Sequence, residues 1–172
     1  MIPICSKKNF FVPKEKNKII DLVLYNQKYF EKELGGYNYP ILEDNNNFFN
    51  QLYSLYYEFC QSIFKFTVHP NNSNTCWAYL SDRLNFAEVW HNHINTSTIN
   101  GVYYLNIPDK TSIDFEHNGK YLNYEPSEFE LIIFPNHLDH KPNRCSGDGY
   151  RISINMEIIC YESTDEIFSR LI

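Results

Sequence analysis

The stretch 150-YRISINMEI-158 alternates polar and apolar side chains without interruption. Successive side chains of a strand point to opposite faces of the sheet, so a period of two predicts a strand with one apolar face. The apolar face would carry Ile152, Ile154, Met156 and Ile158. The polar face would carry Arg151, Ser153, Asn155 and Glu157. We therefore expect this stretch to lie in a sheet that buries its apolar face.

Short runs of the same kind precede this stretch and are separated by residues that favour turns. The turn residues are Pro108-Asp109, Asn118-Gly119, Pro126 and 147-GDG-149. Many short strands at nearly regular spacing are typical of an antiparallel sandwich or barrel. The predicted strands are Cys76–Leu80, Phe86–His93, Gly101–Ile107, Ser112–Glu116, Phe129–Phe134 and Tyr150–Cys160.

The first part of the chain has the pattern of helices rather than strands. After an extended lead-in over residues 1–13, apolar residues at helical spacing predict a helix over residues 14–34, which ends at Gly35-Gly36. Residues 37–46 read as a loop, and an apolar stripe predicts a second helix over residues 47–64. We expect an α+β, mainly β fold in which these helices buttress the sheet.

The length of 172 residues fits one domain. Residues 1–66 would form a mostly helical buttress, and residues 75–172 would carry the strand core. The five cysteines form no CxxC pair and are odd in number, so we expect free thiols in a reducing cytoplasm. The abundance of Asn, Lys, Ile, Tyr and Phe is what an AT-rich viral or bacterial genome would encode.

Charge and hydropathy exclude several classes of partner. The formal net charge is −6, and lysine and arginine form no stripe. Such a chain is a poor nucleic-acid binder, because contacts to phosphate carry most of that affinity. No segment approaches 18 consecutive apolar residues, so we expect no membrane span. A small molecule or a peptide is the expected partner, and the oligomeric state cannot be read from the sequence.

Three of the six histidines form the strongest chemical pattern in the chain. His91 and His93 lie two residues apart, and on a strand both side chains would point to one face. Two imidazoles on one face make half of a transition-metal site. His140 follows the apolar run that ends at Phe134-Pro135, and strand pairing could bring it opposite the pair. Any one of these histidines alone would more often be structural, but together they predict a metal centre.

The polar face of the 150–158 stretch offers a second functional group. Taken alone, an ordinary half-exposed strand explains this face. Beside a metal centre, Arg151 followed two residues later by Ser153 is what a small dicarboxylate requires. The guanidinium presents a planar pair of donors to a carboxylate, and the hydroxyl adds another donor.

These residues together resemble the 2-oxoglutarate/iron(II)-dependent oxygenases. The resemblance rests on His91-Asn92-His93, 101-GVYYLNIP-108, 132-IIFP-135, His140 and 151-RISIN-155. The chain is similar in particular to a prolyl-hydroxylase-like branch that is common in phages and marine microbes. Members of this branch carry the pattern H-x-H…SGVYYL…FP…H…R-I-S. The resemblance covers roughly residues 85–157.

This resemblance implies a distorted double-stranded β-helix, which is a cupin-like jelly roll. It implies an Fe(II)- and 2-oxoglutarate-dependent dioxygenase that uses O2 to hydroxylate a C–H bond. His91 and His140 would be metal ligands, and Arg151 would anchor the distal carboxylate of 2-oxoglutarate. Ser153 and Tyr104 would assist Arg151. Beyond the metal centre, no catalytic residue is implied.

The middle ligand departs from the usual pattern of the superfamily, which is His-x-Asp/Glu…His. Here that position is His93, so either three histidines bind the metal or a carboxylate comes from elsewhere. Glu88, Asp114 and Glu116 are the nearest candidates. In addition, Asn100 stands where a serine usually precedes the glycine.

Two other functions have to be distinguished from this one. A three-histidine cupin-type dioxygenase would bind its substrate directly without 2-oxoglutarate, and Arg151 with Ser153 argues against it. A metal-free jelly-roll module for binding or structure would need no converging histidines. The substrate cannot be read from the sequence, and peptidyl proline is the first candidate by analogy alone.

Overall fold

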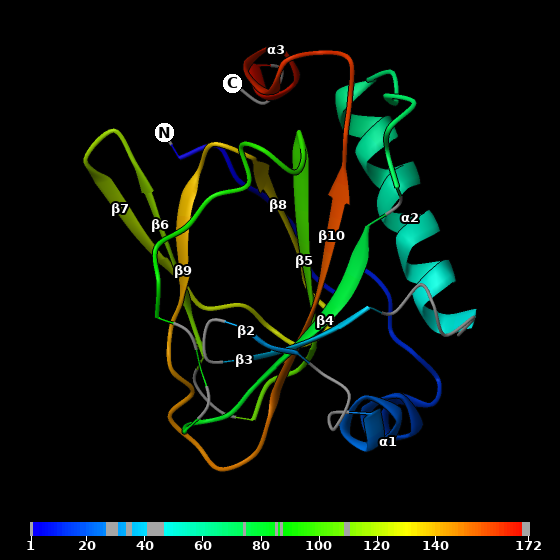
Figure 1. The fold of residues 1–172 in the computed structure, drawn as a ribbon, viewed down its shortest axis with the longest axis vertical. Coiled ribbons are helices and arrows are strands. Elements are labelled where there is room, and N and C mark those ends of the chain that lie inside the picture. Colours follow the sequence, from blue (N-terminus) through cyan, green and yellow to red (C-terminus); the bar gives the residue numbers. More distant parts are fainter. Residues whose placement is uncertain are drawn as a thin grey trace.

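A computed structural model describes residues 2–26, 31–33, 36–40, 47–73, 75–84, 86, 88–108 and 111–169. Two antiparallel sheets face each other in this structure (Figure 1). The larger sheet has the strand order β1-β8-β5-β10-β4-β3-β2, and the smaller has the order β7-β6-β9. The larger comprises β1 (Cys5–Lys7), β2 (Glu31–Glu33), β3 (Gly36–Pro40), β4 (Cys76–Ser81), β5 (Ile99–Asn106), β8 (Leu131–Pro135) and β10 (Arg151–Ile158). The smaller comprises β6 (Ile113–His117), β7 (Lys120–Tyr124) and β9 (Asp139–Pro142).

Helices pack against the outer face of the larger sheet, as α2 does beside β4 and β10 in Figure 1. The three helices are α1 (Lys16–Asn26), α2 (Asn47–Phe64) and α3 (Thr164–Phe168). The outer core contains Ile152, Ile154, Met156 and Ile158, which is the whole apolar face predicted for the last strand. A second, smaller core lies between the two sheets. It contains Val102, Tyr104, Ile113, Phe115, Ile132, Phe134 and Leu138.

This arrangement confirms the predicted fold class, a jelly roll of antiparallel strands with buttressing helices. The helix predicted over residues 47–64 has the same bounds as α2, and five of the six predicted strands form within a few residues of their predicted ends. β8 starts at Leu131 and not at Phe129, because Phe129 takes a positive φ of 62° that a strand cannot continue through. The structure also adds β1, β2 and β3 to the larger sheet from the first part of the chain.

Three local predictions were wrong. The described residues of segment 86–93 form no regular strand, because the segment crosses from one sheet toward the other. Of these residues, only His91 forms an isolated bridge. The first helix ends at Asn26, where the Asn26 side-chain amide donates to the carbonyl of Leu22, and Glu31–Glu33 then pairs with β3. The predicted loop over 37–46 begins inside β3, which pairs with β4; residues 41–46 lie outside the described part.

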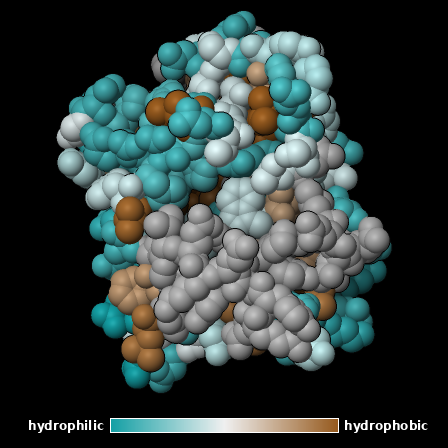
Figure 2. All heavy atoms as spheres, viewed as in Figure 1, coloured by the Kyte–Doolittle hydropathy of each residue, from teal (hydrophilic) through white to brown (hydrophobic). Residues whose placement is uncertain are grey.

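The space-filling view shows hydrophilic side chains over most of the described surface on one face, with apolar side chains in separate small patches (Figure 2). None of the described helices combines the length and the apolar character that crossing a bilayer requires. The apolar side chains of the larger sheet are covered by the helices on its outer face and by the smaller sheet on its inner face.

Gly101 lies where a side chain of helix α2 packs tightly against the sheet. A Cβ atom at Gly101 would lie 2.4 Å from Cε2 of Tyr56, which is fully buried and donates a hydrogen bond to the carbonyl of Ile99. We expect Gly101→Ala to lower the free energy of unfolding by about 1–3 kcal/mol, because overpacking forces the ring or the helix to shift. Thermal unfolding followed by circular dichroism measures the loss. The double variant Gly101→Ala/Tyr56→Leu should recover part of it, and an unchanged single variant would contradict the tight contact.

Candidate metal centre

His91 and His140 face each other across two backbone hydrogen bonds. The amide of His91 donates to the carbonyl of His140 over 3.0 Å, and the amide of His140 donates to the carbonyl of His91 over 2.9 Å. This antiparallel bridge ties the segment ahead of β5 to strand β9. On its other side β9 pairs with β6, where His140 stands opposite Phe115. Phe115 belongs to the smaller core between the two sheets. The backbone thus directs His140 into the space between the sheets.

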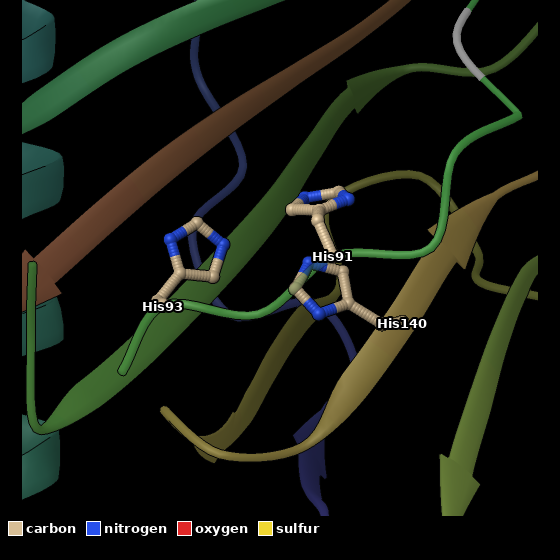
Figure 3. A group of neighbouring side chains, drawn as sticks. All are labelled: His91, His93 and His140. Carbon is tan, nitrogen blue, oxygen red and sulfur yellow. The ribbon is translucent and has the colours of Figure 1, made fainter. Parts of the chain in front are cut away.

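His93 completes the group from the same segment as His91 (Figure 3). Its amide donates to the carbonyl of Asn136, in the turn between β8 and β9, over 2.8 Å. The ring centroids of His91 and His93 lie 4.2 Å and 5.2 Å from that of His140. One ligand atom of each of the three residues lies within 4.8 Å of the others, so the group could hold a metal ion. The three predicted ligands therefore come together in space.

The second nitrogen of each ring explains how the imidazoles are oriented. Nδ1 of His91 lies 3.0 Å from the carbonyl oxygen of Val89, and Nδ1 of His140 lies 3.1 Å from that of Leu138. Nδ1 of His93 lies 2.8 Å from Oε1 of Glu157. Unprotonated oxygens of this kind only accept, so each Nδ1 carries the proton and donates it. In each neutral ring the lone pair then lies on Nε2, which is the arrangement that metal-ligating histidines use.

Burial keeps the two bridged imidazoles neutral. Burial, and then the neighbouring His91 and His93, hold the pKa of His140 well below its usual range. Burial also lowers the pKa of His91, and the carbonyl of Val89 only partly offsets this effect. Only the neutral form of imidazole binds a metal. At neutral pH these two rings are therefore in the form that a metal requires.

The carboxylates that the sequence suggested as alternative ligands are engaged elsewhere. Glu88 accepts from the amide of Arg144, Asp114 lies 3.5 Å from Nζ of Lys141, and Glu116 accepts from the amide of Gly119. The carboxylate at the site is that of Glu157. Its place on the polar face of β10 was predicted, but nothing in the local sequence connects it with His93.

Arg151 lies on the same polar face of β10 and is 2% exposed. Nη1 donates to the carbonyl of Asn143, three residues beyond His140, over 3.0 Å. Nε and Nη2 are buried, and no described residue accepts a hydrogen bond from them. The ring of Tyr79 lies 5.7 Å from the guanidinium carbon. A buried cation with two unused donors is costly unless an anion completes the site.

Residues with hydroxyl groups share the inner side of the sheet with Arg151. Strand pairing places Ser153 opposite both Tyr104 and Tyr79, and places Arg151 opposite Ser81. Ser81 is 1% exposed, and its hydroxyl has no hydrogen-bond partner among the described residues. Burial raises the pKa of Tyr104 above its usual range, although the charge of Arg151 acts in the opposite direction. Tyr104 therefore stays protonated at neutral pH and can donate to an anion.

Ser81 was missed by the sequence reasoning, because a serine at the end of a strand has no distinctive pattern. It is identified only by its position across the sheet from Arg151. The predicted Arg151, Ser153 and Tyr104 share the inner side of the larger sheet with it.

Comparison with known proteins finds solved structures of similar fold at low sequence identity. No protein-family model and no curated protein matches the sequence. Among solved structures, a prolyl-4-hydroxylase of Pseudomonas putida superposes with a TM-score of 0.71 at 12% identity, covering 94% of this chain and 95% of its own. A prolyl hydroxylase from Trichoplax adhaerens, in complex with a hypoxia inducible factor peptide, gives 0.72 at 13% identity over 92% and 84% of the two chains.

A third solved structure has a different activity. SnoN, a non-haem alpha ketoglutarate-dependent epimerase from nogalamycin biosynthesis, superposes with a TM-score of 0.69 at 7% identity, covering 90% of this chain and 76% of its own. At these identities the likeness establishes the fold alone. The chain has the fold on which these hydroxylases and this epimerase are built.

Proposed function

We propose that this protein, built on the fold of the prolyl hydroxylases, is an iron(II)- and 2-oxoglutarate-dependent dioxygenase that hydroxylates a C–H bond. One observation carries the proposal. The inner side of the jelly roll combines three converging imidazoles with a buried guanidinium that has two unused donors. The imidazoles suit a transition metal, and the guanidinium suits a carboxylate. 2-Oxoglutarate bridges two such sites, because it has a keto acid at one end and a carboxylate at the other.

Each group has one task in this function. Nε2 of His91, His93 and His140 would bind the iron and leave coordination positions for the co-substrates. Arg151, with Ser153 and Tyr104, would bind the distal carboxylate of 2-oxoglutarate. When bound, iron, O2 and 2-oxoglutarate supply the oxidising chemistry, in which the keto acid becomes succinate and CO2 and one oxygen atom enters the substrate. The chain itself binds, orients and excludes water.

The guanidinium also distinguishes this proposal from a three-histidine dioxygenase that needs no 2-oxoglutarate. Such an enzyme would leave Arg151 with its Nε and Nη2 donors buried and unused. A metal-free binding module would explain neither the three converging rings nor their Nδ1 partners. Both alternatives leave costly buried groups without a role.

For the substrate we propose a peptide, with a prolyl side chain as the first candidate. One structural neighbour is a prolyl hydroxylase in complex with a peptide. Beside His91 the segment exposes Trp90, whose ring meets Tyr121 edge-on at 6.1 Å and lies 5.5 Å from Nζ of Lys141. Exposed aromatic rings near a metal centre offer a surface on which a prolyl ring can pack.

Succinate release tests the proposed reaction. The protein is purified without oxygen, loaded with Fe(II) and supplied with 2-oxoglutarate and O2. Succinate should form slowly without substrate and faster with a proline-containing peptide, whose mass should rise by one oxygen atom. If the metal-loaded protein produces no succinate and O2 consumption is independent of 2-oxoglutarate, the dioxygenase without 2-oxoglutarate is favoured. If the protein retains no iron, the metal-free module is favoured.

Ser81 gives a prediction in which binding and stability respond differently. We expect Ser81→Ala to raise the concentration of 2-oxoglutarate needed for half-maximal succinate release by about three- to tenfold, the value of one hydrogen bond. The thermal unfolding temperature of the ligand-free protein should stay the same or rise, because the deleted hydroxyl has no described partner. Equal 2-oxoglutarate requirements in the variant and the wild type would remove Ser81 from the proposed 2-oxoglutarate site.

A further inference from the structure

Glu157 is a buried carboxylate whose position calls for an explanation. It is 5% exposed, and it is the residue of β10 that reaches the histidine group. Oε1 lies 2.8 Å from Nδ1 of His93 and accepts a hydrogen bond of 2.9 Å from the hydroxyl of Thr96. Among the described residues, the ion pairs of Glu157 include no lysine or arginine. Burying a carboxylate is unfavourable unless a cation neutralises it, so a metal ion held by the histidine group would stabilise Glu157.

We propose that Glu157 is a positioning residue that orients His93 and supplies the negative charge that a carboxylate ligand would otherwise bring to the iron. The inference rests on the proposed function, because it concerns the same metal centre. In this arrangement the carboxylate accepts the Nδ1 proton of His93, fixes the ring and leaves Nε2 for the ion. The ion in turn provides the positive charge that the buried carboxylate lacks.

The other two histidines differ from His93 because the partner of their Nδ1 atom is uncharged. Nδ1 of His91 and of His140 donates to a backbone carbonyl, which fixes the ring without adding a charge. Only the middle position, where His93 replaces the acidic ligand expected in the pattern, has a carboxylate partner. A hydrogen bond to a carboxylate raises the basicity of a ligating imidazole, and loss of such a partner typically weakens metal binding by about 10–100-fold.

Three variants separate the charge from the hydrogen bond and from general stability. Glu157→Gln keeps an acceptor for Nδ1 but removes the charge, whereas Glu157→Ala removes both. Glu130→Gln is the matched control, because Glu130 is 0% exposed and accepts hydrogen bonds from Tyr124 and from the amide of Ser127 without contacting an imidazole. Co(II) is the probe, added to the metal-free full chain without 2-oxoglutarate, and its visible absorption reports both affinity and ligand field.

We expect the dissociation constant for Co(II) to rise about tenfold or more in Glu157→Gln and further in Glu157→Ala, toward the 100-fold end of the range. The Co(II) spectrum should shift in both variants. The control should bind Co(II) as the wild type does with an unshifted spectrum, even if its unfolding temperature falls. Wild-type affinity in Glu157→Ala would overturn the proposal, and so would an equal loss of affinity in the control.

A substitution at His93 gives a test with opposite signs. His93→Asp places a carboxylate directly at the middle ligand position, where it would repel Glu157. Adding Glu157→Gln to this variant should therefore strengthen Co(II) binding, whereas the same change weakens binding in the wild-type background. Weakening in both backgrounds would overturn the charge argument. If the wild-type protein binds neither Co(II) nor Fe(II), both the proposed function and this inference fail. If the wild type binds metal and Glu157→Ala binds it equally well, only this inference fails.

Discussion

Replacing His140 with alanine is expected to weaken metal binding more than about a hundredfold. This exceeds the loss that is typical when the removed residue only hydrogen-bonds to a metal ligand. His140 is 4% exposed, its pKa is held low by burial, and both its amide and its carbonyl form hydrogen bonds with the backbone of His91. It is therefore a rigid, neutral ligand, and no other described histidine can replace it. Titration of the metal-free protein with Co(II), and iron content after anaerobic reconstitution, measure the loss.

His137→Ala is the matched control for this prediction. His137 precedes His140 by three residues, but its contacts are with residues outside the group: its ring lies 5.7 Å from that of His117, and its Nδ1 lies 3.8 Å from Oδ1 of Asp165. The control should bind Co(II) as tightly as the wild type. Wild-type metal content in both His140→Ala and His137→Ala would contradict the three-histidine centre. Metal loss in both variants would point to a local folding defect instead.

Replacing Arg151 with methionine is expected to raise the requirement for 2-oxoglutarate at least tenfold, while Co(II) binding without 2-oxoglutarate stays unchanged. A charge-assisted contact to a buried carboxylate is worth about 2–5 kcal/mol when one partner is removed, and about 1.4 kcal/mol corresponds to a factor of ten. Methionine retains an apolar chain of similar reach but offers no donors. Half-maximal 2-oxoglutarate concentration for succinate release and Co(II) titration give the two measurements.

Stability of the ligand-free protein should change in the opposite direction. The wild type buries a guanidinium with two unused donors, so Arg151→Met should unfold at an equal or higher temperature. In protein already loaded with metal, adding 2-oxoglutarate should then raise the unfolding temperature of the wild type but not that of Arg151→Met, because ligand binding stabilises the folded state. Arg144→Met is the control, since Arg144 donates to the carbonyl of Arg83 near the surface and should retain the wild-type response. A wild-type response in Arg151→Met would remove 2-oxoglutarate from the proposal.

Alternation within single segments accounts for most of what could be predicted. The period of two in residues 150–158 assigned Ile152 and Ile154 to the core beneath the helices, and the helical stripe of residues 47–64 gave the bounds of α2. The same reasoning failed for residues 86–93, where two histidines two residues apart do share a site without a regular strand. Backbone bonds from His91 to His140 and from His93 to Asn136 replace the strand that was expected.

The sequence by itself determined which side chains share a face, because the direction of a side chain follows from the local backbone repeat. It therefore assigned Arg151, Ser153 and Glu157 to one polar face, and the spacing of the histidines singled out His91, His93 and His140, to which the resemblance gave metal-ligand roles. Only the tertiary structure decided which residues meet across strands. The contact of Glu157 with His93 and the position of Ser81 opposite Arg151 both depend on how distant segments pair. The register of such a pairing cannot be read from either segment alone.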